Sequence, residues 1–141
     1  METQQQVITV KTTVDAPIQK VWKFWSEPQH IEKWNNASPE WHTPHAENDL
    51  RPGGKFLARM EAKDGSFGFD FGGVYDEVKE DEYIAYTLGD GRKVAIAFTP
   101  IGDQTSIIET FEAESTNPQD MQQKGWQAIL NSFKKYTEAN V

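Results

Sequence analysis

The chain has 141 residues, of which 37% are hydrophobic and 26% are charged, and these values fit one folded globular domain and argue against disorder. Its net charge of −8 argues against nucleic acid and anionic membrane surfaces as partners, because both bind clustered Lys and Arg. The absence of cysteine excludes disulfides, zinc–thiolate sites and a cysteine nucleophile.

The N-terminus lacks the basic region and apolar stretch of a signal peptide. No apolar run approaches the roughly 20 residues that a membrane span requires. We therefore expect a cytoplasmic protein without a membrane partner. Because no linker, repeat or low-complexity block interrupts the sequence, we expect a single domain over residues 1–141.

The first predicted elements are a strand and two short helices. Residues 7–14 are β-branched at nearly every position, which predicts a strand. Asp15 can cap a following helix, and Pro17 suits its first turn. One face of this helix carries apolar residues at i, i+3, i+4 and i+7, namely Ile18, Val21, Trp22 and Trp25. Pro28 starts a second short helix that reaches Trp34.

The next segment, residues 35–52, is expected to be irregular because Pro39, Pro44 and Pro52 interrupt it. It contains His42 and His45, which suggest a metal site at first sight. Zinc proteases place two histidines four apart on a helix, whereas these two are three apart with a proline between them. We therefore predict no metal site here.

A series of hairpin-linked strands follows. The stretches KDGS, GDGR and GDQT are turn signals, and they separate runs rich in β-branched and aromatic residues. This pattern predicts an antiparallel meander with strands at residues 55–62, 67–78, 83–88, 93–101 and 106–114. We expect a bulge or bend at Gly72–Gly73.

The last predicted element is a long helix. Asn117 is expected to cap it, Pro118 takes the first turn, and Asp120 suits the positive N-terminal end. At about 100° per residue, one broad face carries Met121, Gly125, Trp126, Ile129, Leu130, Phe133 and Tyr136. Such a helix packs its apolar face on a sheet, so the predicted fold class is α+β.

Five stretches carry a family resemblance that covers nearly the whole chain. They are APIQKVWKFWSEPQHIEKW, RPGGKF, DGSFGFDFGGVYDEV, YIAYT and NPQDMQQKGWQAILNSFKKY. Their order and spacing resemble the START-like superfamily, also called the SRPBCC or helix-grip fold. The likeness is greatest to the branch related to the C-terminal domain of the heat-shock-protein-90 ATPase activator.

This resemblance implies a curved antiparallel sheet that grips the C-terminal helix, with a cavity between them. It often implies a bound apolar or amphipathic small molecule. The superfamily includes lipid carriers, polyketide cyclases, aromatases and plant hormone receptors, so the fold alone does not define the function. The full chaperone activator also has a separate N-terminal domain. Because this sequence starts at the first strand, we expect chaperone contact to be the least favoured role.

Glu109 is the strongest polar candidate for such a cavity. It shares strand parity with Ile107 and Phe111, so it faces the interior if they do. A carboxylate there must be paired, hydrogen-bonded or protonated.

Two registers are open for the strands around Gly72–Gly73. In the favoured register, Arg59, Glu61 and Asp70 form a charge ladder on the outer face of the sheet. A slip of one residue would invert the faces and bring Arg59 and Asp70 into the cavity with Glu109.

The aromatic content, 12% of the sequence, exceeds what a two-layer domain of this size usually buries. We read it as the lining of a hollow site, although core packing explains many of these residues individually. The loop that contains Trp41 and His42 is expected at the cavity mouth, and His45 on the surface. The predicted cavity residues are Trp34, Trp41, His42, Phe56, Met60, Phe69, Phe71, Tyr86, Phe98, Glu109, Phe111, Trp126, Leu130 and Phe133.

Binding of a small hydrophobic or aromatic ligand is the leading functional hypothesis, with no cofactor. A cyclase, aromatase or hydrolase using the same cavity is the second, with Glu109 or His42 as general base. No G-x-S-x-G elbow or phosphate loop supports a specific catalytic class. A chaperone-type protein interaction is the third hypothesis.

Overall fold

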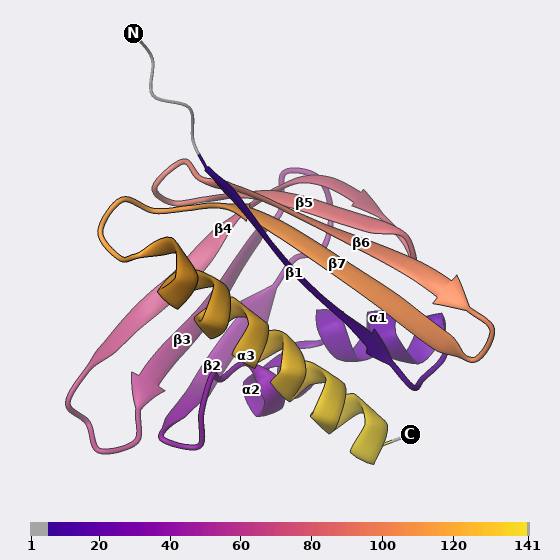
Figure 1. Cartoon of the computed structure of the whole chain (residues 1–141), viewed down its shortest axis with the longest axis horizontal. Coiled ribbons are helices and arrows are strands. Elements are labelled where there is room, and N and C mark those ends of the chain that lie inside the picture. Colours follow the sequence, from indigo (N-terminus) through magenta and orange to yellow (C-terminus); the bar gives the residue numbers. More distant parts are fainter. Residues whose placement is uncertain (1–5, 141) are drawn as a thin grey trace, which may run out of the picture.

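A curled seven-stranded antiparallel sheet with a long helix across its concave face forms the body of the molecule (Figure 1). This computed structural model describes residues 6–140. The expectation that the N-terminus lacks a signal peptide concerns residues 1–5 in part, and these lie outside the described residues. The elements are β1 (Val7–Val14), α1 (Ile18–Ser26), α2 (Pro28–Trp34), β2 (Trp41–Asn48), β3 (Lys55–Ala62), β4 (Gly68–Lys79), β5 (Tyr83–Leu88), β6 (Lys93–Ile101), β7 (Gln104–Glu112) and α3 (Gln119–Ala139). The predicted α+β helix-grip class is confirmed.

The strand order is β1-β7-β6-β5-β4-β3-β2, so the N-terminal strand extends the meander from β2 to β7 by pairing with β7. α3 lies along β1, where the Gln127 amide donates to the Lys11 carbonyl oxygen at 3.0 Å and the Lys134 ammonium donates to that of Thr13 at 2.7 Å. These bonds fix the helix at one side of the sheet.

The core lies where α1 and α2 meet α3 and the sheet. Phe133 of α3 is fully buried between Trp25 and Trp34, whose ring centroids are 4.9 Å and 5.0 Å from its own. The Trp34 indole N–H donates to the Phe24 carbonyl oxygen, which satisfies its polar atom. The aromatic faces predicted for the helices are therefore used partly for packing.

The expectation that residues 35–52 are irregular is wrong, because β2 occupies much of this segment. β2 is one of the two edge strands, and its pairing with β3 shifts between His42 and His45. Pro44 lies within that irregularity, where its missing N–H does not break a regular ladder.

Both side-chain caps predicted for the helices are also wrong. Pro17 and Pro118 occupy the N-cap positions, and neither Asp15 nor Asn117 makes a capping hydrogen bond. Gln122 organises the start of α3 instead, since its Oε1 accepts from the Glu114 N–H at 2.9 Å and its Nε2 donates to the Asn117 carbonyl oxygen at 2.8 Å.

Gln122 therefore takes the inward position in the first turn of α3, and its side chain is buried. Met121, one position earlier, is rotated by about 100° and is 58% exposed. The prediction that Met121 belongs to the inner face is wrong, because the hydrogen bonds of Gln122 set the rotation of this turn.

The favoured register of the central strands is confirmed. Arg59 pairs with Asp70 without a shift across Gly72–Gly73, and the irregularity expected there lies between Tyr75 and Glu77 on the β4–β5 side. On the outer face the Arg59 guanidinium contacts Glu61 at 2.9 Å and Asp70 at 3.4 Å. The cavity face is thereby left to apolar residues of β3 and β4.

Candidate functional site

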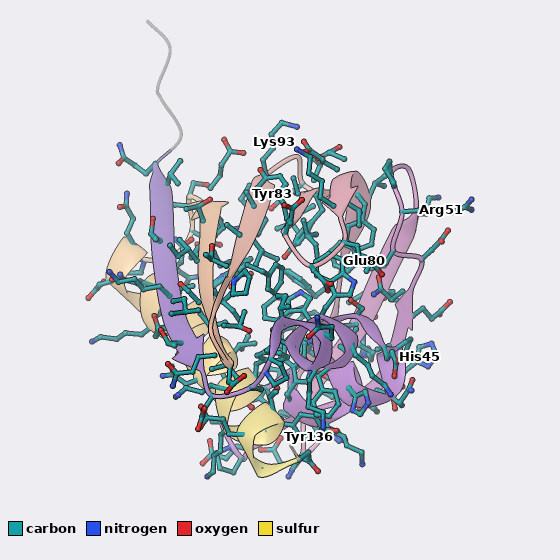
Figure 2. The ribbon with its side chains drawn as sticks, turned by 90° about the vertical axis from the view of Figure 1, so that its right-hand side faces the viewer. His45, Arg51, Glu80, Tyr83, Lys93 and Tyr136 are labelled. Atoms are coloured by element: carbon teal, nitrogen blue, oxygen red, sulfur yellow. The ribbon has the colours of Figure 1, made fainter. Side chains whose placement is uncertain are left out.

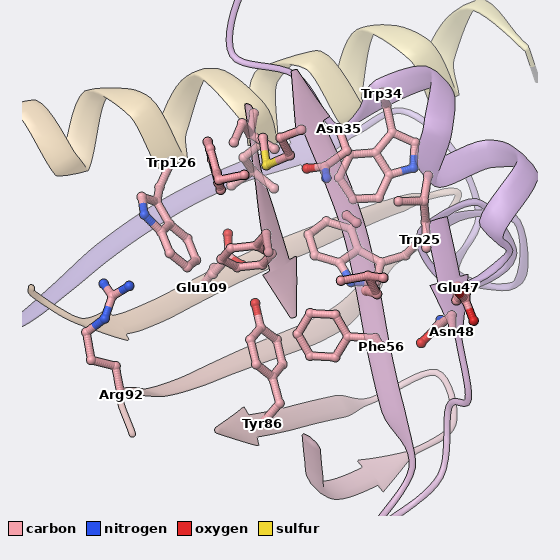
Figure 3. Close-up of a pocket in the computed structure, with 18 of the residues that line it drawn as sticks. Trp25, Trp34, Asn35, Glu47, Asn48, Phe56, Tyr86, Arg92, Glu109 and Trp126 are labelled. Carbon is pink, nitrogen blue, oxygen red and sulfur yellow. The ribbon is translucent and has the colours of Figure 1, made fainter. Parts of the chain in front are cut away.

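A cavity of about 320 Å³ lies between the concave face of the sheet, α2 and the N-terminal half of α3 (Figure 3). This volume is at the lower end of the range for small-molecule sites. Eight aromatic residues line it, namely Trp25, Trp34, Phe56, Phe69, Phe71, Tyr75, Tyr86 and Trp126.

Strand alternation explains how β3 and β4 build one wall. Phe56, Ala58 and Met60 share the parity that faces the cavity, and Phe69 and Phe71 pair with this face from β4. The predicted residues that line the cavity are Trp34, Phe56, Met60, Phe69, Phe71, Tyr86, Glu109, Trp126 and Leu130.

Phe98, Phe111 and Phe133 were predicted as cavity residues but belong to the core. All three are at most 3% exposed. Trp126 stacks on Phe111 with ring centroids 3.9 Å apart and separates it from the cavity. Sequence parity gives the face of a side chain, but it does not give the depth of the layer in which the side chain packs.

Trp41 and His42 lie on opposite faces of the edge strand, so they cannot both border the cavity. Trp41 faces inward next to the cavity, with its ring centroid 6.0 Å from that of Phe69. His42 faces outward, with its Nε2 3.8 Å from Glu61, and its predicted place at the mouth is wrong.

His45 projects from the outer side of the same edge (Figure 2). Its Nε2 is 2.8 Å from the Glu47 carboxylate, and both side chains are more than half exposed. Residues 6–140 contain no group of three or more metal-ligating side chains.

Several cavity residues were missed from the sequence. Tyr75 follows Phe69 and Phe71 at the same strand parity, so that alternation could have indicated it. Asn48 was missed because its segment was not recognised as a strand. Arg92 follows a turn, and no periodic signal identifies a side chain that reaches the cavity from such a position.

Glu109 is the buried ionisable group of the cavity. It is 6% exposed and makes no hydrogen bond or ion pair within the described part of the chain, and its strand neighbours are Val10 and Ile96. Burial raises the pKa of the Glu109 carboxyl to about 8. The carboxyl is therefore mostly protonated at neutral pH and can donate a hydrogen bond.

Tyr86 places a second polar group beside it. The residue is 7% exposed, and its hydroxyl points toward Glu109 in Figure 3 without a hydrogen-bond partner among residues 6–140. Burial raises the pKa of the Tyr86 hydroxyl well above its usual value, and Glu109 adds to this effect. The hydroxyl therefore stays protonated.

Tyr75 and Asn48 form a different polar contact at the far side of the cavity. The Tyr75 hydroxyl donates to the Asn48 side-chain oxygen at 2.5 Å, and the Asn48 amide donates to the Ser26 carbonyl oxygen at 2.6 Å. These polar groups are satisfied by the protein, whereas those of Tyr86 and Glu109 have no partner in the described part of the chain.

The sequence profile of the Activator of Hsp90 ATPase homolog 1-like proteins matches residues 15–138. None of the curated proteins compared with the chain matches it. Within residues 6–140, no helix has the length and apolar character required to cross a membrane.

Solved structures match over nearly the full length. Chr148 from Cytophaga hutchinsonii is 65% identical over 94% of this chain and 92% of its own, with a TM-score of 0.81. The AHSA1-like protein from Aeromonas hydrophila is 40% identical over 96% of this chain and 94% of its own, with a TM-score of 0.90. NE0264 from Nitrosomonas europaea is 19% identical over 96% of both chains with a TM-score of 0.82, and it is similar in fold alone.

Proposed function

This chain belongs to the family of Activator of Hsp90 ATPase homolog 1-like proteins, and its own helix-grip fold encloses a cavity. We propose that the protein binds a small apolar or aromatic molecule in this cavity. The supporting observation is an aromatic cavity of about 320 Å³ lined by two buried residues, Tyr86 and Glu109, whose polar groups have no partner within residues 6–140. Apolar burial would contribute about 25 cal/mol per Å² before the costs of association.

A ligand would also satisfy Glu109 and Tyr86. A buried polar group without a partner costs about 1–3 kcal/mol, so a molecule that hydrogen-bonds to these groups gains over one that does not. The cavity therefore favours a ligand with an apolar body and a polar end.

Native mass spectrometry of the protein purified from its own cells tests this proposal. Ala58→Leu adds bulk to the cavity wall, and Ala95→Leu adds the same bulk to the outer face of the sheet. We expect a stoichiometric bound molecule in the wild type and in Ala95→Leu, and its loss in Ala58→Leu. A molecule retained equally in all three proteins, or absent from all, would contradict the proposal.

An enzyme that uses the same cavity is the second candidate. It is favoured by the pKa of Glu109, which burial raises to about 8, since a general acid or base works best near the ambient pH. Turnover distinguishes the two functions: a binder returns the captured molecule unchanged, whereas an enzyme converts it and loses that activity in Glu109→Leu.

Chaperone contact is the third candidate, and it rests on the description of the family alone. An ATPase assay with purified heat-shock protein 90 tests it. We expect no stimulation by this protein, and stimulation that survives Ala58→Leu would favour a surface interaction over the cavity.

A further inference from the structure

We propose that the cavity selects an apolar molecule that ends in a carboxylate, whose oxygens accept hydrogen bonds from Tyr86, Arg92, Trp126 and Glu109. This inference rests on the proposed function and specifies the chemistry of its ligand. The four groups come from β5, from the segment between β5 and β6, from α3 and from β7, and they all line the cavity.

Three of these groups have N–H or O–H groups still available, and two of them, Arg92 and Trp126, can only donate. Neither the Tyr86 hydroxyl nor the Trp126 indole N–H has a hydrogen-bond partner in the described chain. Arg92 donates through Nε to Asp90 at 2.8 Å and through Nη1 to the Glu112 carbonyl oxygen at 3.4 Å, which leaves other N–H groups free. Figure 3 shows Arg92 and Trp126 on the same side of the cavity.

Glu109 is the fourth group. Like Tyr86, this residue is more than nine-tenths buried, and its side chain lines the cavity. A ligand carboxylate beside Glu109 would share one proton with it, because two adjacent carboxyl groups cannot both ionise in an apolar site. In that arrangement Glu109 acts as a donor.

The number of donors identifies the acceptor. A ketone oxygen has two lone pairs, so it leaves donors unpaired, whereas a carboxylate offers about four acceptor sites. An ammonium group brings three donors that only the Tyr86 hydroxyl or an ionised Glu109 could accept; ionising Glu109 is opposed by its burial, and the ammonium would also face the Arg92 cation. A carboxylate therefore fits this pole of the cavity better than a ketone or an amine.

The other acidic groups of the lining, Glu47 and Glu114, have partners of their own. The Glu114 carboxylate accepts from the Asn117 N–H at 2.5 Å and is held by its own loop. Glu47 is paired with His45 at the exposed edge of the sheet. The residues of α3 in the lining are uncharged, and β1 and β6 place Val10 and Ile96 beside Glu109. Arg92 is thus the cation of this pole.

The test compares three compounds with one naphthalene body: 2-naphthoate, 2-acetonaphthone and 2-naphthylmethylamine. Isothermal titration calorimetry at pH 7 should give a dissociation constant for naphthoate at least tenfold lower than that for the ketone, and the weakest binding for the amine. Tyr86→Phe should weaken naphthoate binding about tenfold. The matched control Tyr83→Phe removes a hydroxyl of the same strand outside the cavity lining and should leave binding unchanged.

The pH profile supplies an independent readout. Since naphthoate binds the protonated form of Glu109, its affinity should fall by about tenfold per pH unit above 8. Glu109→Gln keeps a donor and does not titrate, so its affinity should stay constant from pH 7 to 9.5. Circular dichroism at each pH confirms that both proteins are folded.

Failure of this inference is distinguishable from failure of the proposed function. Equal affinities for naphthoate and the ketone, both lost in Ala58→Leu, would overturn the selection of a carboxylate and leave cavity binding intact. Binding that persists unchanged in Ala58→Leu would place the probes elsewhere and contradict both. An affinity of the wild type for naphthoate that does not change with pH would show that Glu109 takes no part in naphthoate recognition.

Discussion

At the scale of single residues, the notable feature of the cavity is a carboxyl group buried in apolar surroundings. Glu109 is buried among apolar neighbours and has no protein partner within residues 6–140. Such a group lowers the stability of the folded chain whenever it must ionise. A ligand of the kind proposed would give this carboxyl a hydrogen-bond partner.

This cost predicts a pH-dependent stability. Burial raises the pKa of Glu109 from 4.5 to about 8, so between these values the unfolded chain ionises while the folded chain keeps the proton. The free energy of unfolding should therefore fall relative to that of Glu109→Gln as pH rises from 4.5 to 8, by on the order of 1 kcal/mol per unit, and level off above 8. Urea denaturation of both proteins from pH 5 to 9 measures this difference, and a constant difference would contradict it.

The sequence indicated Glu109 because strand parity is a strong constraint on which face a side chain occupies. The same rule separates Trp41 from His42, but it could be applied only after β2 was known to be a strand. Arg92 and the hydrogen bonds of Gln122 arise from the three-dimensional course of loops, which local patterns do not contain.

At the scale of elements, the cavity wall requires close approach of neighbouring strands. A Cβ added at Gly73 would collide with the Thr87 carbonyl oxygen on β5, and one added at Gly72 would lie 2.6 Å from the Phe56 carbonyl oxygen on β3. The two glycines therefore allow the sheet to bend across β3, β4 and β5 and to form its concave face.

Substitution of these glycines should be costly for this steric reason. Gly73→Ala should lower the free energy of unfolding by about 1–3 kcal/mol, a typical cost of overpacking. Gly89→Ala is the matched control, since its added Cβ would meet no atom within 4 Å. Thermal or urea unfolding measures both variants, and equal stabilities would refute the account of the bend.

The start of α3 depends on Gln122 in a comparable way. Gln122→Ala removes its hydrogen bonds to Glu114 and Asn117, so we expect a loss of about 1–3 kcal/mol and local fraying of the first turn. Gln123→Ala, which removes one exposed bond to the Thr9 carbonyl oxygen, is the control. Amide hydrogen exchange at residues 114–122 should accelerate in Gln122→Ala alone. Unchanged exchange would show that the loop and the first turn of α3 are stable without the Gln122 hydrogen bonds.

Most elements were predictable because hairpin turns and the amphipathic helix leave periodic signals. β2 was not, since prolines normally exclude regular strands, and only its position at the sheet edge with an irregular register permits Pro44. The helix starts were misplaced because tertiary hydrogen bonds, rather than local caps, define them.

At the scale of the whole molecule, the order of the motifs was sufficient for the helix-grip fold, and the family profile over residues 15–138 agrees with it. The cavity itself was less predictable, since its volume is the space that remains after every side chain has packed. Phe98, Phe111 and Phe133 fill the core, while rings of similar size at Phe56, Phe71 and Trp126 stay at the cavity wall. A difference in depth of one side-chain layer separates these two groups.

Methyl chemical-shift mapping by NMR tests the central claim, cavity binding, most directly. Addition of 2-naphthoate should shift the methyl signals of Ala58, Met60, Ile129 and Leu130, which line the cavity, and leave those of the exposed Ile101 and Ile108 in place. Shifts confined to exposed methyl groups, or the same cavity shifts in Ala58→Leu, would contradict the claim that this protein holds its ligand between the sheet and α3.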